Sequence, residues 1–492
     1  MLEELVKEAP NKIIAKKNEI FIAMISIFMG VLLGSVAGWF SVYSSSVRFL
    51  FLFFGLFFLL VSFYKPLWGL FILIGFFLSP TLFYSEEITS LEIFWGMLFI
   101  AGFTGALLRA FLERKRLLLS FKKETILWLA LFFLIWLAAS LLLSLREGET
   151  ITWWLRQYVD FIGYSLVFWV VWSIGRKNER WIKILVGLFL IIGVAKGFEQ
   201  LIYYLYYLPG AIASGNFQIL RGRFFAEFFV IPGPILAICL YVYSKKRTEK
   251  LFFAFLTFFF LILLALSFTR SLWIGFLVSF LVLLFSFKSF RAKITEIMYP
   301  LFIVMIVAIG GGFFLRREAM VYLFQWLKIR LYSYFKFGVQ LSMLERFAEW
   351  KALWNLSWRK PLFGHGIGSS FTFYSINPWS WVREGGVGWV SIRYSHNIYL
   401  YLFYTVGIVG LFLFMMLIFN VIKKAKLIQS RSSDPFVKAY CTAIYSICIG
   451  FLVTSITCPI FMGKANSVYI GLLFGVFAVL NRKNILEESK YK

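Results

Sequence analysis

The sequence is poor in acidic residues and in the side chains that usually hold metal ions. It has 24 Asp and Glu against 50 Lys and Arg, and only two Asp, two His and four Cys. The Cys residues lie in or beside apolar segments without metal-ligand spacing, so we interpret them as small packing residues. P-loop, GxGxxG, HExxH and Asp-x-Asp motifs are absent. We therefore expect no bound metal and no other cofactor.

Apolar surface, by contrast, is abundant. Of the 492 residues, 61% are hydrophobic and 21% are aromatic, whereas soluble domains are usually about 45–50% apolar. This composition excludes a cytosolic enzyme, a disordered scaffold and a disulfide-stabilised secreted domain. We expect an all-α polytopic membrane protein. We also expect no cleavable signal peptide, because the first 19 residues are polar and the next apolar run is long enough to span.

Apolar runs near the length of a membrane-spanning helix, about 20 residues, recur along the chain. About 14 spanning helices are predicted, and 12 if one weak hairpin does not span. The predicted spans centre on residues 20–40, 48–63, 67–84, 93–111, 126–144, 158–174, 182–207, 227–243, 251–268, 271–287, 298–315, 396–420, 438–458 and 465–481.

The positive charge follows the loops between these spans, which indicates membrane topology rather than nucleic-acid binding. With the N-terminus in the cytoplasm, the cytoplasmic segments hold 31 basic residues and the short outer loops hold seven. Cytoplasmic loops of membrane proteins are enriched in Lys and Arg, so both termini are predicted to be cytoplasmic. The predicted organisation is a cytoplasmic segment at 1–19, eleven spans in 20–315, an outer loop at 316–394, three spans in 395–481 and a cytoplasmic tail at 482–492.

The long outer loop has its own charge pattern, with eleven basic and four acidic residues in 79. Either a basic surface lying on anionic lipid headgroups or an anion-binding chamber would explain it. Phe347, Trp350 and Trp354 share one face of a predicted amphipathic helix, which Pro361 would end. Residues 320–341 also have the mixed aromatic and basic pattern of a helix lying in the membrane plane.

Three outer-face residues are candidates for binding and catalysis. Arg270 stands between two apolar runs, where it would either bind an anion or anchor the helix at the interface. Arg346 lies on the amphipathic helix and would otherwise be a solvated charge. His396 opens the helix after the long loop, as a polar cap, a packed residue or a base that activates a hydroxyl. Without a metal, a diphosphate substrate would need such arginines to neutralise it.

The motifs around these residues resemble those of bacterial O-antigen ligases. His396-Asn397, nine residues and then Gly407-Ile408-Val409-Gly410 matches the His-Asn-x9-Gly-x-x-Gly pattern of that family. Residues 363–368 (FGHGIG) resemble its Gly-x-Gly turn, residues 267–275 (SFTRSLWIG) its Ser-x-Thr-Arg-x-x-Trp-Leu-Gly segment, and Arg346 with Trp350 its Arg-x3-apolar motif. The resemblance spans about residues 265–412. The extra His365 inside the glycine turn and the helix count above twelve depart from the pattern.

The resemblance implies a membrane-embedded fold of the GT-C class, in the bacterial inner membrane with a periplasmic active site. The implied reaction transfers a glycan from undecaprenyl diphosphate to a hydroxyl of the lipid A-core oligosaccharide, with inversion and without metal. Arg270 and Arg346 would bind the diphosphate and His396 would be the catalytic base. Arg221 and Arg223 are weaker candidates for the same diphosphate.

Other functions stay open from the sequence. A polymerase of the same superfamily would use a second carrier-linked repeat unit as acceptor, and a related branch would glycosylate protein Ser or Thr. A transporter or flippase for lipid-linked anionic sugars would place ionisable residues at the bilayer midplane. Most predicted helices of this chain are uniformly apolar, and this pattern does not favour a transporter. His365 could compete with His396 as the base, but we expect its glycine-flanked loop to be mobile and its imidazole to be poorly positioned.

Overall fold

The structure is a computed structural model. It describes residues 46–75, 90–112, 124–174, 180–214, 227–267, 269–288, 290–293, 341–375 and 387–488, together with isolated positions between 296 and 328. The chain divides into two compact units, Met1–Leu119 and Ser120–Lys492.

In the first unit, two long apolar helices pack closely together. These are α2 (Ser46–Tyr64) and α4 (Ser90–Leu112), with α3 (Pro66–Gly75) beside them. At Gly105 of α4 a Cβ atom would lie 2.3 Å from the Leu59 carbonyl oxygen, so only glycine permits this approach. Arg109 donates a 2.8 Å hydrogen bond to the Tyr64 carbonyl, which joins two helix ends that the sequence predicts on the same membrane side.

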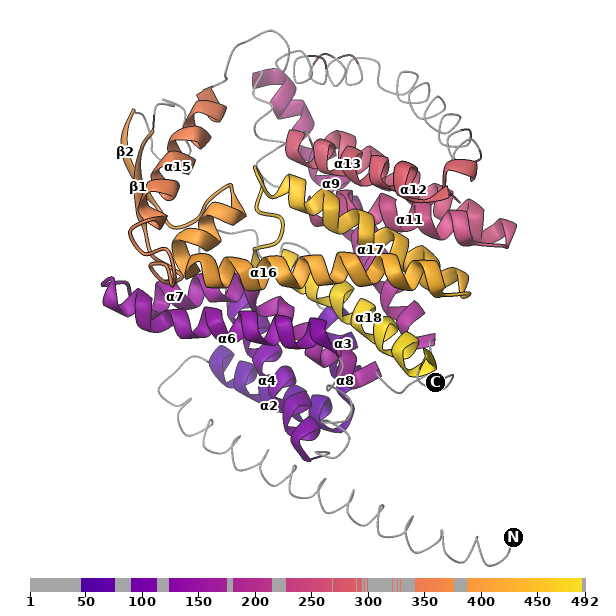
Figure 1. Ribbon diagram of the computed structural model, residues 1–492, viewed down its shortest axis with the longest axis horizontal. Helices are drawn as coiled ribbons and strands as arrows, with labels where there is room; N and C mark the ends of the chain where they lie inside the picture. The colour runs from indigo at the N-terminus through magenta and orange to yellow at the C-terminus, as the bar shows by residue number, and fades with distance from the viewer. Residues whose placement is uncertain are drawn as a thin grey trace, which may run out of the picture. The chain divides into compact units, whose positions relative to one another are not determined.

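The second unit is a helical bundle with one small hairpin (Figure 1). Its elements are α6 (Thr125–Arg146), α7 (Ile151–Tyr158), η2 (Val159–Ser165), α8 (Leu166–Ile174), α9 (Arg180–Ser214), η3 (Glu227–Val230), α11 (Pro232–Tyr243), α12 (Arg247–Leu266), α13 (Arg270–Ser286), α15 (Leu341–Ser357), β1 (Phe371–Ser375), β2 (Gly388–Ile392), α16 (Ile398–Arg431), α17 (Pro435–Thr454) and α18 (Lys464–Glu488).

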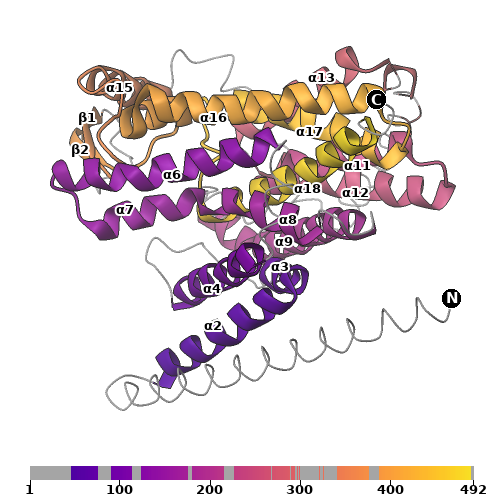
Figure 2. The same ribbon diagram turned by 60° about the horizontal axis from the view of Figure 1, so that its bottom comes forward.

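Helix α18 lies at the centre of this bundle. The apolar window of its span, Ala465–Arg482, is 83% buried, whereas that of α12 is 33% buried and leaves most of its surface for lipid. At Gly471 a Cβ atom would lie 1.9 Å from the Gly163 carbonyl oxygen, so α18 and η2 touch through their backbones. Helix α16 runs alongside α6 and α17, and Figure 2 shows the α6–α16 pair from a second direction.

The helix ends group into two sets. Where α17 ends, the Ser455 carbonyl accepts a hydrogen bond from the Ile398 amide at the start of α16. At the opposite end, Asn481 of α18 donates to Glu124, which precedes α6. We call these ends the α15 end, after the helix it carries, and the Glu124 end. The grouping of α6, α16, α17 and α18 agrees with the alternation predicted from the loop charges.

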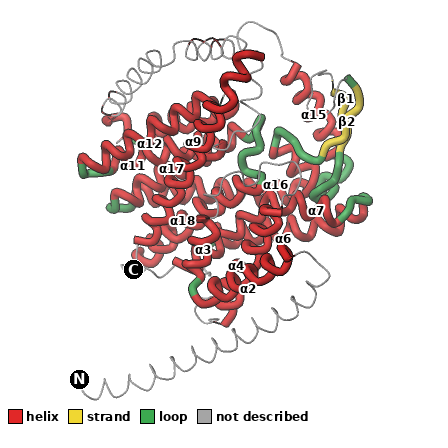
Figure 3. The backbone as a smooth tube through the Cα atoms, turned by 180° about the vertical axis from the view of Figure 1, so that it is seen from behind, coloured by secondary structure: helices red, strands yellow, loops and turns green. Residues whose placement is uncertain are grey.

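An α15–hairpin layer covers the α15 end (Figure 3). Strands β1 and β2 pair antiparallel, with Phe373 opposite Val390. The strands alternate buried and exposed residues, as expected for a sheet with one packed face. That face and α15 share a core of Leu353, Phe371, Phe373, Val390, Ile392 and Tyr404. A helix is present where we predicted one around Arg346, and the hairpin is a feature that we did not predict.

Seven helices in the described part of the chain are long and apolar enough to cross a membrane. The prediction of a helical polytopic membrane protein is therefore confirmed, and the β1–β2 hairpin is the one departure from the predicted all-α fold among the described residues. The predicted span at 158–174 belongs to a longer one, Ile151–Ile174, which a 3-10 turn interrupts. Predicted spans 20–40 and 298–315 and most of the predicted in-plane helix at 320–341 lie outside the described residues. The total of 12 to 14 spanning helices stays a prediction.

Candidate active site

The two glycine motifs meet in one backbone joint at the α15 end. Helix α16 breaks at Gly407, which has φ +68° and ψ −174°. In an unbroken helix the Ile408 amide would donate to the Tyr404 carbonyl. Instead it donates to the Pro361 carbonyl over 2.8 Å, and the Tyr404 carbonyl accepts from the His365 amide over 2.9 Å. The turn after α15 thereby satisfies the backbone groups that the break releases, as a membrane helix requires.

The same turn is fixed on its other side by α6. The Gly366 amide donates to the Thr405 carbonyl over 2.7 Å, and Ser144 of α6 donates to the Ile367 carbonyl over 2.6 Å. Gly366 has φ +94°, and a Cβ atom there would lie 2.3 Å from the Ser144 hydroxyl. Glycine is therefore needed for both conformation and space. The expectation of a mobile loop is wrong, because α6 and α16 both bind its backbone.

His365 sits in this turn with both ring nitrogens occupied. Nδ1 lies 3.2 Å from Glu147 Oε2 and Nε2 lies 3.2 Å from the Leu356 carbonyl. The ring stacks on Tyr404, with centroids 4.7 Å apart. Burial lowers the pKa of His365, the charges of Lys360 and Arg359 add to the decrease, and the Leu356 carbonyl opposes it. This environment keeps the imidazole neutral and places it as a structural link between α15 and α16.

His396 is placed differently, beside a buried carboxylate. Its Nδ1 lies 2.9 Å from Glu349 Oε2, and its amide donates to Glu349 Oε1 over 2.9 Å. The Ser395 hydroxyl also donates to Glu349. Glu349 is 1% exposed, whereas the His396 side chain is 30% exposed. A carboxylate at Nδ1 favours the tautomer of the neutral imidazole in which Nδ1 carries the proton and Nε2 keeps its lone pair. Within the described structure, Nε2 makes no hydrogen bond.

Asn397, the second residue of the His-Asn motif, caps α16. Its side-chain oxygen accepts from the amides of Tyr399 and Leu400 over 3.0 and 3.1 Å. This is the usual arrangement of an asparagine N-cap, and it starts the helix at Ile398, two residues later than predicted. His396 therefore precedes the cap and is not itself the cap. The cap and Glu349 together fix the backbone on both sides of the imidazole.

Helix α15 brings Arg346 to the same region, three residues before Glu349. Its face with Glu349 and Leu353 turns towards His396 and the hairpin. Phe347 and Trp354, on the apolar face that we predicted, are 47% and 49% exposed. The helix ends at Ser357, before Pro361, as predicted. Arg346 thus stands beside the residues that hold the imidazole.

The thiol of Cys458 lies near both Arg346 and the start of α13. It donates to Glu227 Oε1 over 3.4 Å. Burial and Glu227 raise its pKa well above the usual value, while the Arg346 charge and a hydrogen bond with Ser271 oppose the increase. Ser271 follows Arg270 in sequence, so the two predicted arginines lie on elements that meet at this thiol. Cys458 is consequently a polar contact, and our interpretation of all four cysteines as apolar packing residues was wrong for it.

The neighbours of Arg270 in sequence make contacts that pack α12, α13 and α17 together. Ser267 donates to the Leu264 carbonyl over 2.7 Å and Trp273 to the same oxygen over 2.7 Å, which closes the end of α12. At Gly275 a Cβ atom would lie 1.8 Å from the Thr454 hydroxyl, so the glycine lets α13 touch α17. These contacts place Arg270 as the first residue of α13, at the α15 end.

A second carboxylate, Glu149, ties the hairpin to the loop before α7. It accepts from Arg393 over 3.1 Å and from the Ser370 amide over 3.0 Å. The Arg393 guanidinium also lies 4.3 Å from the ring centroid of Trp153. Burial favours a higher pKa for Glu149, but the hydrogen bonds from Ser370 and Arg393 lower it overall. The pair holds the strand that leads to His396.

Not every predicted site residue can be placed. Arg221 and Arg223 lie outside the described residues. Lys196 and Glu199, three residues apart in α9, form an ion pair over 2.8 Å. In the described part of the chain, no group of three or more His, Cys, Asp or Glu side chains could hold a metal ion. Metal-independent transfer stays a prediction.

Sequence reasoning missed Glu349, Glu147 and the backbone joint. Glu349 is one of only four acidic residues in the 316–394 segment, and the scarcity of carboxylates was the signal that could have drawn attention to it. Its partner is 47 residues away in sequence. Helical spacing alone could not show that contact.

The fold and this site define a polytopic membrane protein with a histidine–carboxylate pair and two arginines at one end of its bundle. Residues 254–415 match the family model described as O-antigen ligase, and that model covers both ligases and polymerases. The matched range contains Arg270, Arg346, His365 and His396. No curated protein sequence matches the chain.

Proposed function

We propose that this protein is a glycosyltransferase of the GT-C class that moves a glycan from undecaprenyl diphosphate to an acceptor hydroxyl on the periplasmic side. The observation that carries the proposal is the buried Glu349 carboxylate at Nδ1 of His396, which leaves Nε2 as a base. The family match supports a lipid-linked glycan as substrate. The α15 end, which carries the site, would then be periplasmic and the Glu124 end cytoplasmic.

In the proposed reaction, Nε2 of His396 accepts the proton of the acceptor hydroxyl as its oxygen attacks the anomeric carbon. The bond from that carbon to the diphosphate oxygen breaks, with inversion, and the diphosphate leaves with the electron pair. Arg270 and Arg346 bind the diphosphate and stabilise its growing negative charge, because a guanidinium donates two parallel hydrogen bonds to phosphate oxygens. Arg221 and Arg223 are further candidates for this anion.

We propose lipid A-core oligosaccharide as the acceptor, which makes the protein an O-antigen ligase of the bacterial inner membrane. The support is the resemblance of the His-Asn motif directly after one large loop. The alternatives are a polymerase, whose acceptor is a second carrier-linked repeat unit, and a branch that glycosylates protein Ser or Thr. A flippase for lipid-linked sugars is the alternative from another class, and it would form no new glycosidic bond.

Reconstitution tests this proposal. Purified protein in liposomes with carrier-linked glycan and lipid A-core should yield the conjugated glycan, and EDTA should not stop the reaction. Parallel reactions with carrier-linked repeat units or a Ser/Thr-rich protein as acceptor distinguish ligase, polymerase and protein glycosylation. His396→Ala should lower transfer by roughly 10²–10⁴-fold, the usual contribution of a general base, while carrier binding persists. Movement of the carrier across the bilayer without any conjugate would contradict the assignment.

A further inference from the structure

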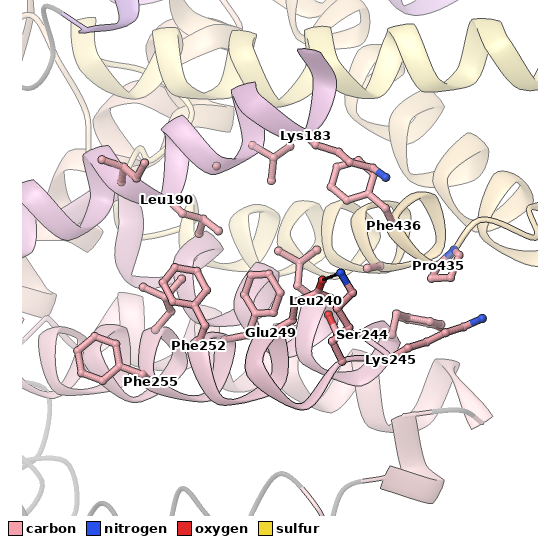
Figure 4. A pocket seen from close by; sticks show the side chains of 18 of the residues that line it. Lys183, Leu190, Leu240, Ser244, Lys245, Glu249, Phe252, Phe255, Pro435 and Phe436 are labelled. Atoms are coloured by element: carbon pink, nitrogen blue, oxygen red, sulfur yellow. Dashed lines mark ion pairs between the residues drawn. The ribbon is translucent and has the colours of Figure 1, made fainter. Parts of the chain in front are cut away.

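A groove at the Glu124 end lies far along the bundle from His396 and has no part in the proposed transfer. Its volume is about 730 Å³, within the range of about 300–1,000 Å³ typical of ligand sites. Helices α9, α11 and α12 and the start of α17 line it. In Figure 4, α9 and α12 face each other across the groove, with Lys183 and Lys245 at one end and Leu190, Phe252 and Phe255 towards the other.

The length of the groove matches one leaflet of a membrane. Its lining extends from Lys183 to Val194 along α9 and from Lys246 to Leu256 along α12. At about 1.5 Å per residue, both stretches are roughly 15 Å long. The hydrocarbon core of a bilayer is about 30 Å thick, so the groove spans about half of it. Phe252 and Phe255 are more than half exposed, as expected for side chains that meet lipid.

The charges at the end of the groove with Lys183 and Lys245 favour an anion. Of the two acidic residues there, Asp434 caps α17 by accepting from the Phe436 amide over 2.7 Å. Glu249 lies 3.8 Å from Lys246. In the described part of the chain, Lys183 and Lys245 have no acidic partner, and the ammonium group of Lys183 lies 5.4 Å from the ring centroid of Phe436. Two cations therefore stand where an apolar channel meets the membrane surface.

We propose that this groove binds an anionic phospholipid, with one acyl chain between α9 and α12 and the headgroup phosphate at Lys183 and Lys245. The apolar lining matches the chain, and basic residues next to a membrane surface attract anionic headgroups. Polyprenyl phosphate shares the phosphate and the apolar tail, but the groove accommodates only about one leaflet of chain. A phospholipid is therefore the occupant that fits its length.

Photo-crosslinking tests the position of the lipid. The full-length protein is reconstituted in phosphatidylcholine nanodiscs that contain phosphatidylglycerol with a diazirine on its acyl chain. Illumination should label peptides from α9 and α12, and unlabelled phosphatidylglycerol should compete better than phosphatidylcholine. Labelling that undecaprenyl phosphate displaces and phosphatidylglycerol does not would overturn the phospholipid assignment.

Gly187 offers a steric test, because a Cβ atom there would meet no other atom within 4 Å. Gly187→Leu should fill the groove and remove the label from α9 and α12. Gly210 is a matched control on the same helix, since its Cβ position is equally open and it lies outside the groove. Gly210→Leu should leave labelling unchanged. Equal labelling of the two variants, at equal thermal stability, would show that the lipid does not occupy the groove.

Lys183 provides the test of charge. Lys183→Ala should weaken the competition by phosphatidylglycerol about fivefold, the effect of about one cation near an anionic membrane surface. Lys423, an exposed lysine on α16 outside the groove, is the matched control, and Lys423→Ala should leave the competition unchanged. The same loss in both variants would indicate only a general effect of surface charge and would overturn a specific headgroup site.

Discussion

Gly407 of α16 and Leu362 of the turn after α15 are in backbone contact, so close that a Cβ atom on Gly407 would lie 2.2 Å from the Leu362 carbonyl oxygen. Two sequence motifs that are 40 residues apart thus form one structural unit. The glycine turn supplies hydrogen bonds to the broken helix, and the break supplies two carbonyls to the turn. His396 precedes this broken helix, so the unit supports the segment that carries the proposed base.

Gly407→Ala should disrupt this unit. The φ of +68° is unfavourable for alanine, and the added methyl group has no space. We expect a loss of about 1–3 kcal/mol of stability from backbone strain alone, seen as a lower melting temperature in detergent. Gly210→Ala is the control, because its Cβ position is open and alanine favours helix. If Gly407→Ala were as stable as Gly210→Ala, the backbone contact would not exist as described.

Glu349→Gln tests whether the carboxylate positions His396. The glutamine side chain can still accept at its one oxygen. It would hold the His396 imidazole, the His396 backbone amide and the Ser395 hydroxyl less firmly than a carboxylate does. Partners that fix the orientation of a catalytic histidine commonly affect rate by about 10–100-fold or more. We expect kcat to fall by at least about tenfold, with little change in the KM for the carrier-linked glycan.

A purely structural role for Glu349 would give a different result. It would lower the amount of folded protein while leaving kcat per folded molecule unchanged. Glu345→Gln is the matched control on the same helix, because Glu345 accepts from Ser375 of the hairpin over 2.9 Å, whereas Glu349 lies 2.9 Å from Nδ1 of His396. That variant should retain kcat. A large loss of kcat in both variants would assign the effect to the α15–hairpin contact in general.

The sequence was sufficient to predict apolar helices along the described part of the chain, because long apolar runs and loop charges are local properties. It placed Arg270, His396 and the helix around Arg346 at one end of the bundle. It could not predict that Glu349 holds His396, since that contact depends on how a hairpin folds the chain back. Gly407 lies against a turn that pairs with a broken helix, an arrangement that no periodicity indicates.

Arg270 and Arg346 should bind the carrier diphosphate. Arg270→Ala should nearly abolish transfer and Arg270→Lys should restore only part, because lysine keeps the charge but loses the planar pair of donors. Arg346→Ala should raise the KM for the carrier-linked glycan and lower kcat. Lys351 is an exposed cation on the same helix as Arg346, and Lys351→Ala should have little effect. Full activity of either arginine-to-alanine variant would remove that residue from the site.

Glu124 should make stability depend on pH at the opposite end of the bundle. Burial raises its pKa to about 7, although the Asn481 hydrogen bond and the charges of Lys424 and Arg482 oppose the increase. The folded protein therefore keeps this proton at pH values where the unfolded chain has lost it. Stability should fall as pH rises from about 4.5 to about 7, by up to about 3 kcal/mol. Glu124→Gln should remove that part of the pH dependence of the melting temperature.

His365 should give the opposite dependence on pH and only a small effect on catalysis. Its pKa is lowered, so below about pH 6.5 the unfolded chain binds a proton that the folded protein resists, and stability falls as pH decreases. His365→Gln, which does not titrate, should lose this dependence when compared with the unmodified protein.

Both ring nitrogens of His365 already contact Glu147 and Leu356, so the ring is not available to a substrate hydroxyl. His365→Ala should therefore lower transfer per folded molecule by less than about tenfold, well below the loss of about 10²-fold or more expected for His396→Ala. The reverse order of the two variants, at equal amounts of folded protein and equal carrier binding, would assign the base to His365.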